Sequence, residues 1–200
     1  MKKSIIISVV LLLILSIATT VNAYSTSEFE IDIPASFKKA GTNVYVDGEG
    51  RSFNITTVPY NEKDGDPYNQ RSIDKMVNEL KEEMNLQDVF IKEITRCTKN
   101  NHKCAHIQSS YPISNMVYYI DQYAIVSGNK IYTLTLSALN KEDLNSGDLK
   151  NVLDSFTIKN YKEPKSTMSP TLIGAIVGAG VGVVLAIVSV IKKKKENQAQ

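Results

Sequence analysis

The sequence lacks the motifs by which most enzyme classes are recognised. It contains no Gly-x-Ser-x-Gly nucleophile motif, no glycine-rich loop of the kind that cradles phosphates, and no paired-histidine metalloprotease motif. Only two histidines occur, His102 and His106, and both lie beside the cysteines. Because no nucleophile with a partner base is recognisable, we expect a protein that is not an enzyme and that uses no cofactor. An envelope enzyme remains an alternative that would require a cleft with clustered titratable groups.

An excess of positive charge is also missing from the central part of the chain. Two of the 23 basic residues lie at positions 2 and 3 and four lie at 192–195, which leaves 17 basic against 20 acidic residues in between. The whole chain is nevertheless at +2. A nucleic-acid footprint needs a basic face, so we expect no nucleic-acid partner.

The segment 171–191 is an apolar run without a charged residue. As a helix it would reach about 30 Å, which matches the hydrocarbon thickness of a bilayer. The lysines at 192–195 follow it directly, and basic residues beside a span stay on the cytoplasmic side. The pattern therefore predicts a single-pass protein of the plasma membrane, with its N-terminal domain extracellular and its C-terminus cytoplasmic. A buried helix of a soluble domain is the competing interpretation.

The N-terminus has the layout of a secretory signal. Two lysines precede the apolar stretch 4–18, and small residues surround position 23 in Val21-Asn22-Ala23. We expect cleavage after Ala23, with an uncleaved anchor and two spans as the alternative. No cysteine follows the signal region, which argues against a lipid anchor there.

The chain between the two apolar ends is long enough for one hydrophobic core and too short for two. A polar stretch that contains Pro164 separates this domain from the span. The predicted organisation is a signal peptide at 1–23, an extracellular α+β domain at 24–159, a stalk at 160–170, a transmembrane helix at 171–191 and a basic cytoplasmic tail at 192–200.

Small residues recur every four positions within the predicted span, at Gly174, Gly178, Gly182 and Ala186. They share one helical face, and small residues allow helix backbones in lipid to approach closely. This row is the predicted packing face for self-association or for a partner subunit. The alternative is that glycine and alanine are simply common in membrane spans.

The N-terminal part of the domain has the periodicity of strands. Phe29, Ile31 and Ile33 alternate with acidic residues, which predicts a half-buried strand that ends at Pro34. The segment 43–58 holds two apolar runs around Asp-Gly-Glu-Gly at 47–50, which predicts a hairpin because glycine supplies the positive φ of the turn.

The rest of the domain predicts helix, four-strand meander and helix. Apolar residues at helical spacing predict an amphipathic helix over 72–85. Strand-like runs follow at 89–96, 104–111, 116–125 and 130–139, with connections short enough for antiparallel neighbours. Both faces of the last run suit burial, so we expect that strand to be central. A second helix is expected at 149–156.

The order of these elements, with "FEIDIPASFKKAG", "YAIVSGNKIYTLTLSA" and "DLKNVLDSFTIK", resembles the PsbP-like family of small α/β/α domains. That resemblance implies an antiparallel sheet packed with two helices, in an α+β fold. It also implies a non-catalytic binding or assembly module, as in photosystem extrinsic subunits, a Ran-binding nuclear protein and bacterial envelope proteins. No functional residue is carried over, because the matching positions are structural.

Cys97 and Cys104 flank a short polar segment between two predicted strands, in a compartment where disulfides form. A bond between them would stabilise the domain by about 2.5 kcal/mol on the chain-entropy model. One alternative is a zinc site that adds His102 and His106, although the spacing fits no common zinc pattern. Free thiols are the other.

Two further patterns are weak. Glu62, Asp64 and Asp66 surround a glycine and could hold calcium, but the twelve-residue loop with a terminal glutamate is missing, which favours a solvated turn. Asn54 begins a glycosylation sequon that falls within a predicted strand.

The sequence therefore predicts a membrane-anchored extracellular module that binds or helps assemble another envelope protein, with the lipid bilayer as its second partner. A small-ligand or metal-ion sensing ectodomain is the alternative. The tyrosines of the predicted strands, among them Tyr118, Tyr119, Tyr123 and Tyr132, allow a binding face on the sheet because tyrosine is enriched at interfaces.

Overall fold

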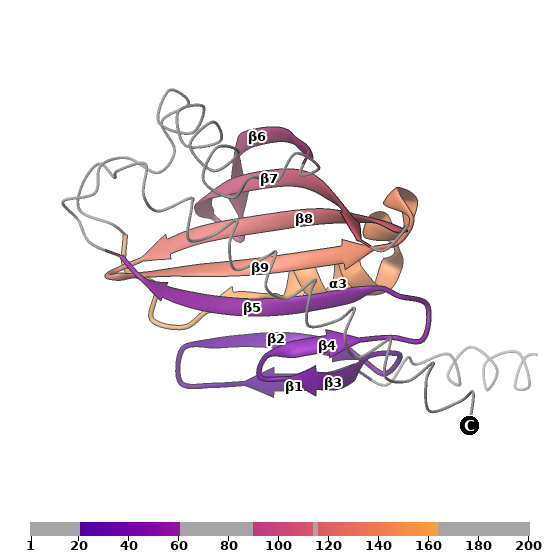
Figure 1. The fold of residues 1–200 in the computed structure, drawn as a ribbon. Helices are drawn as coiled ribbons and strands as arrows, with labels where there is room; N and C mark the ends of the chain where they lie inside the picture. The colour runs from indigo at the N-terminus through magenta and orange to yellow at the C-terminus, as the bar shows by residue number, and fades with distance from the viewer. Residues whose placement is uncertain (1–20, 61–89, 114–115, 164–200) are drawn as a thin grey trace, which may run out of the picture.

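The computed structural model describes residues 21–60, 90–113 and 116–163, which form two antiparallel sheets and two short helical elements (Figure 1). The large sheet has seven strands in the order β3-β4-β5-β9-β8-β7-β6, and the small sheet has three in the order β1-β2-β10. The strands of the large sheet are β3 (Lys38–Gly41), β4 (Val44–Val46), β5 (Ser52–Pro59), β6 (Phe90–Lys99), β7 (His102–Ile113), β8 (Met116–Ser127) and β9 (Lys130–Ala138). Those of the small sheet are β1 (Val21–Ser25), β2 (Phe29–Pro34) and β10 (Thr157–Ile158).

The predicted four-strand meander is confirmed. β6, β7, β8 and β9 follow one another in the sheet as antiparallel neighbours. β9 lies between β8 and β5, and nearly all of its side chains are buried, so the strand expected to be central is central. The connection between β6 and β7 is shorter than expected, because only Asn100 and Asn101 lie between the paired residues Lys99 and His102.

The predicted hairpin over 43–58 is also confirmed, with β4 paired to β5. Gly50 has φ of 82°, and a side chain there would place its Cβ 2.8 Å from Leu139 Cδ1. Glycine is therefore required both by the backbone conformation and by the space. The Asp47 carboxylate closes the loop by accepting hydrogen bonds from the backbone N–H groups of Glu49 and Arg51, at 2.8 and 2.9 Å.

The small sheet was not predicted. We expected one antiparallel sheet made of the hairpin and the meander, with no stated partner for the strand at Phe29, whereas β2 pairs with β1 and β10 in a second sheet. Neither partner strand could be recognised from the sequence. β10 is only two residues long, too short for an alternating pattern, and β1 lies in the stretch that resembles the end of a signal peptide. β1 runs across the predicted cleavage position after Ala23.

The helical elements are η1 (Lys141–Asn145), a 3₁₀ helix, and α3 (Gly147–Ser155). The helix predicted at 149–156 is confirmed in α3, which begins two residues earlier and has the acidic Asp148 in its first turn. The other predicted helix, at 72–85, lies outside the described residues, so the described part of the chain holds one α-helix rather than two.

α3 and the small sheet share one hydrophobic core with the large sheet. The core joins Phe29 and Ile31 of β2, Leu134 and Leu136 of β9, and Leu149 of α3, all of which are buried. Each such side chain stabilises the fold by roughly 1.5–3 kcal/mol when it leaves water. This packing covers β5 and β9 on one face of the large sheet and extends over Cys104 of β7 and Ile125 of β8.

The described residues contain no helix that is long and apolar enough to cross a membrane. The predicted span at 171–191, the basic tail and residues 1–20 of the predicted signal lie outside the described residues. The first residues of the predicted stalk pack on the domain: the Gly128 N–H donates to the Lys162 carbonyl at 2.9 Å, and the Lys162 N–H donates to Ser127 Oγ at 3.0 Å.

Candidate functional site

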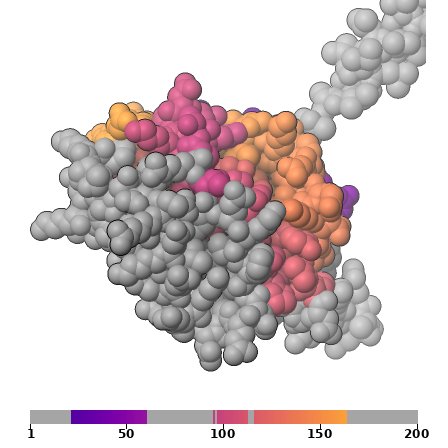
Figure 2. All heavy atoms as spheres, turned by 90° about the horizontal axis from the view of Figure 1, so that it is seen from above, coloured from indigo at the N-terminus to yellow at the C-terminus, as the bar shows by residue number. Residues whose placement is uncertain are grey.

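One part of the large sheet is left half-exposed on the face that α3 covers elsewhere. Side chains of β8 alternate between buried even positions and more exposed odd positions from 117 to 123. In β7 the parity is reversed, with buried odd positions and more exposed even positions from 106 to 110. Figure 2 looks onto the edge of the large sheet at β6 and β7, where the orange residues that follow β9 lie beside the red and magenta strands. We call this surface the open face; it consists of His106, Gln108, Ser110, Val117, Tyr119, Asp121 and Tyr123.

The strand register builds the open face. Gln108 lies directly opposite Asp121, Ser110 opposite Tyr119 and His106 opposite Tyr123. Residues opposite one another in an antiparallel pair project from the same side of the sheet, so side chains from two strands form one surface.

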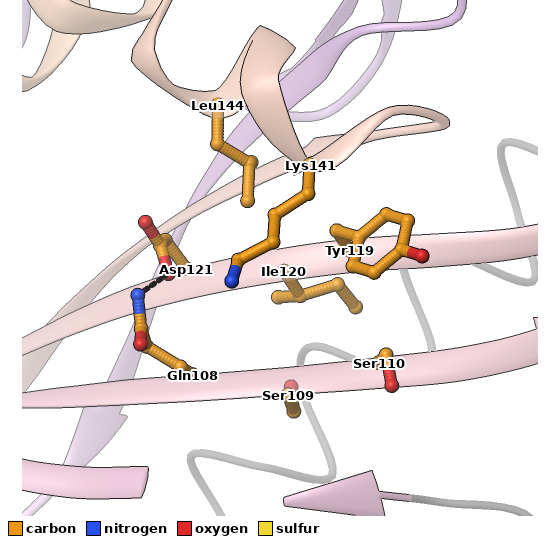
Figure 3. A pocket seen from close by; sticks show the side chains of 8 residues that line it. All are labelled: Gln108, Ser109, Ser110, Tyr119, Ile120, Asp121, Lys141 and Leu144. Carbon is orange, nitrogen blue, oxygen red and sulfur yellow. Dashed lines mark hydrogen bonds between the residues drawn. The ribbon is translucent and has the colours of Figure 1, made fainter. Parts of the chain in front are cut away.

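A pocket of about 160 Å³ lies where η1 crosses the open face (Figure 3). η1 follows β9 directly and contacts β8, which places its first turn over the strands. The walls are formed by Gln108, Ser109, Ser110, Tyr119, Ile120, Asp121, Lys141 and Leu144.

Asp121 lies at the polar end of this pocket. Its Oδ1 accepts a hydrogen bond from Gln108 Nε2 at 3.1 Å, and His106 Nε2 lies 3.3 Å from the same oxygen without reaching hydrogen-bond geometry. The side chain of Asp121 is only 13% exposed. A carboxylate that is this deeply buried is stable only with charged or multiple hydrogen-bonding partners. Its neighbours here are one amide and one imidazole.

Lys141 stands on the opposite wall. Figure 3 shows its side chain extending from η1 toward Gln108 and Asp121. Among the described residues it makes no ion pair within 4.0 Å, with Asp121 or with any other acid. The pocket thus holds an anion and a cation on facing walls that are not in contact with each other.

Tyr123 and His106 form a stacked pair next to the pocket, with ring centroids 4.4 Å apart and an angle of 10° between the planes. Burial, together with the charges of Asp121 and Asp154, raises the pKa of Tyr123 to about 12. The phenol is therefore protonated at neutral pH and is suited to packing and hydrogen bonding rather than to proton abstraction.

The open face ends in an apolar rim. Val117 is 42% exposed and is the most exposed large hydrophobic side chain among the described residues. It lies two residues from Tyr119 along β8, on the same side of the sheet. Apolar and aromatic side chains next to a small pocket with a few polar groups are typical of a recognition surface.

Comparison with solved structures identifies the fold. The solution structure of cyanobacterial PsbP (CyanoP) from Synechocystis sp. PCC 6803 matches with a TM-score of 0.51, over 71% of this chain and 94% of that chain, at 13% sequence identity. This chain has a PsbP-like fold. At this level of identity the likeness concerns the fold alone.

Two further solved structures are similar to this PsbP-like chain. One is LpqN, described as involved in cell envelope biogenesis of Mycobacterium tuberculosis, at 14% identity over 73% of this chain and 94% of that chain, with a TM-score of 0.44. The other is a protein from Bacteroides thetaiotaomicron, at 11% identity over 66% of this chain and 45% of that chain, with a TM-score of 0.44. No family model and no curated protein matches the sequence.

The two cysteines of the PsbP-like domain lie where the sequence predicted. Cys97 and Cys104 are cross-strand partners in the β6–β7 hairpin, with Cα atoms 4.9 Å apart, and the pair is at disulfide distance. The pair lies at one end of the sheet and does not line the pocket. The predicted packing face at Gly174, Gly178, Gly182 and Ala186 lies outside the described residues.

The alternative zinc interpretation gains no support. His102, Cys104 and His106 share one side of β7 as expected, but His102 stacks on Tyr161 with ring centroids 3.7 Å apart. Burial lowers the pKa of His102. Across the described ranges, no three His, Cys, Asp or Glu side chains are placed to hold a metal ion.

The structure describes two of the three remaining sequence patterns, the sequon and the tyrosines, but not the acidic loop. Asn54 is 1% exposed in the middle of β5, so the sequon asparagine is inaccessible to glycosylation in the folded domain. The acidic loop with Glu62, Asp64 and Asp66 lies outside the described residues. Of the tyrosines considered for a binding face, Tyr119 and Tyr123 lie on the open face, whereas Tyr118 and Tyr132 are buried.

Sequence reasoning missed Gln108, Asp121 and Lys141. Each is an ordinary polar residue in or after a predicted strand, and nothing in the local pattern marks it. The signal that could have found the first two is the period-2 alternation of β7 and β8, but their register had to be known before the two residues could be placed opposite each other.

Proposed function

We propose that this chain is a non-catalytic, membrane-anchored extracellular module that binds or helps assemble another envelope protein. The apolar ends and the lysines at 192–195 support the location. The stalk is short: its first residues, through Lys162, pack on the domain, and the remaining positions 163–170 reach at most about 29 Å when extended. The domain therefore works close to the bilayer surface, on a partner in the same envelope or on a second copy of itself.

The open face is the observation that carries this proposal. Most of the large sheet is buried, yet the β7–β8 part of one face presents Tyr119, Tyr123 and the exposed Val117 around a pocket. Tyrosine contributes large contact area at low entropic cost, and a pocket beside it can receive an anchoring side chain.

Site-specific photo-cross-linking in intact cells tests the proposal. A photoreactive phenylalanine analogue at Val117 is expected to give a discrete adduct larger than the chain. The same analogue at Lys38, which is exposed on the edge strand β3, is the matched control and is expected to give none. Equal labelling at both positions, or no adduct at either, would refute a binding role for the open face. An adduct of twice the mass of the chain would identify the partner as a second copy.

A small-ligand sensing ectodomain is the second candidate. The specific observation in its favour is the separation of Asp121 and Lys141 on opposite walls of a small pocket, since a bound molecule with matching charges would pair with both.

A further inference from the structure

The volume of the pocket limits the size of its occupant. Pockets for drug-sized ligands measure about 300–1,000 Å³, whereas this one measures about 160 Å³. An engineered protein cavity of about 150 Å³ is filled by benzene. The occupant therefore has on the order of six to ten non-hydrogen atoms, which excludes nucleotides and oligosaccharides.

The carboxylate of Asp121 lacks a positively charged hydrogen-bond donor among the described residues. Among the described residues only its Oδ1 accepts a hydrogen bond, from the neutral amide of Gln108, while Oδ2 accepts none. His106 adds no hydrogen bond to the carboxylate, although its Nε2 is buried beside it. An ammonium group of a ligand would give this largely buried carboxylate the charged partner that it lacks.

The ammonium group of Lys141, which lines the same pocket, could pair with an anionic group of a ligand. Its ammonium carries three donors and has no acidic partner in the described part of the chain. A ligand with a single positive charge would gain from Asp121 and lose to Lys141, and a ligand with a single negative charge would do the reverse. A ligand that carries both charges pairs with Asp121 and with Lys141 at once, whereas a neutral ligand gains neither ion pair.

From these observations we infer that the pocket binds a small zwitterion of the α-amino-acid class. The ammonium group pairs with Asp121 and the carboxylate with Lys141. A small apolar side chain fits against Leu144 and the ring of Tyr119, which with Ile120 supply the apolar part of the walls. This inference deepens the second proposed function and rests on it.

Calorimetric titration of the full-length protein in mild detergent tests the inference, with alanine as the probe. Alaninamide lacks the carboxylate and lactate lacks the ammonium, so both serve as singly charged controls of nearly the same size. Alanine is expected to bind, and each control is expected to bind at least about tenfold more weakly. Alaninamide or lactate binding as tightly as alanine would overturn the zwitterion inference and leave small-ligand binding standing. No binding of any of the three would overturn the inference and remove the support for ligand sensing.

Variants locate the binding in the pocket. Asp121→Asn and Lys141→Gln are each expected to weaken alanine binding by about tenfold. Glu142→Gln is the matched control, because Glu142 is exposed on η1 and does not line the pocket. Lys141 is also exposed, so its replacement leaves the fold intact and keeps the test valid if Asp121→Asn is unstable. Unchanged affinity in Lys141→Gln would contradict the inference.

Discussion

The side-chain amide of Asn100 donates a hydrogen bond of 2.6 Å to the backbone carbonyl of Phe156. Asn100 is the first residue of the two-residue turn between β6 and β7, and Phe156 caps the end of α3. An ion pair between Lys99 and Asp154 joins the same two elements. The tip of the edge hairpin is thus fastened to the helix that packs on the neighbouring strands.

Removing the Asn100 amide should loosen this junction. Asn100 and Asn101 have φ values of 49° and 64°, which are typical of a type I′ turn and suit glycine equally well. Asn100→Gly keeps the turn but loses the hydrogen bond, and we expect the free energy of unfolding to fall by about 1 kcal/mol in denaturant titration. Asn101→Gly is the control and should change it by less than about 0.5 kcal/mol. Equal effects of the two substitutions would show that the bond to Phe156 contributes nothing.

The cysteine pair should stabilise the same hairpin. Replacing both Cys97 and Cys104 by serine is expected to lower the free energy of unfolding by about 2.5 kcal/mol, because the unfolded chain is released from a short closed loop. Thr98→Ser, within the hairpin, should have little effect. Mass spectrometry after alkylation without reductant provides a direct check, and two labelled thiols would contradict the bond.

Helix α3 should owe its position to Leu149, which is fully buried in the shared core. Leu149→Ala is expected to cost about 2–5 kcal/mol, since the cavity it leaves is only partly filled by relaxation. Lys150→Ala, at the exposed neighbouring position, should cost less than about 0.5 kcal/mol. Similar losses for both, measured by denaturant titration, would mean that α3 does not pack on the sheet as described.

The sequence was a good guide where patterns are local and repetitive. The hairpin around Gly50, the meander and α3 each follow from turn residues or from apolar spacing within one segment. β9 could be recognised as central because both of its faces are compatible with burial. The closeness of Cys97 and Cys104 follows from their positions on adjacent strands of one hairpin.

The sequence did not reveal which distant segments pair or pack together. β1 and β10 are strands only because β2 lies between them, and neither has a pattern of its own. The pocket combines Gln108 and Asp121, which meet through the β7–β8 register, with Lys141, which is brought over the sheet by η1. Register and helix placement depend on tertiary packing, so a residue-by-residue pattern does not reveal the site.

The stability of the domain should fall at alkaline pH, in part through Tyr123. Its pKa is raised to about 12 in the folded state, above the ordinary value of 10.0, so the unfolded chain loses this proton first. The contribution is fully present below pH 10 and is lost as the pH rises toward 12. Tyr123→Phe should make the decline over this window shallower, as measured by thermal unfolding.

Tyrosinate absorbance gives an independent measure of the same group. Asp154→Asn removes one of the charges that raise the pKa of Tyr123, so the titration of this tyrosine should move to lower pH. An unchanged titration together with an unchanged alkaline decline in Tyr123→Phe would show that burial and charge do not hold this proton.

The central claim is that a folded domain outside the cell is tethered to the membrane by the apolar segment at 171–191. Protease treatment of intact cells, with a tag fused to the C-terminus, tests it most directly. The account predicts that the domain is digested from outside, while the tag remains protected and sediments with the membranes. A protein that is untouched in intact cells, and that stays in the supernatant after the cells are broken and centrifuged without detergent, would contradict it.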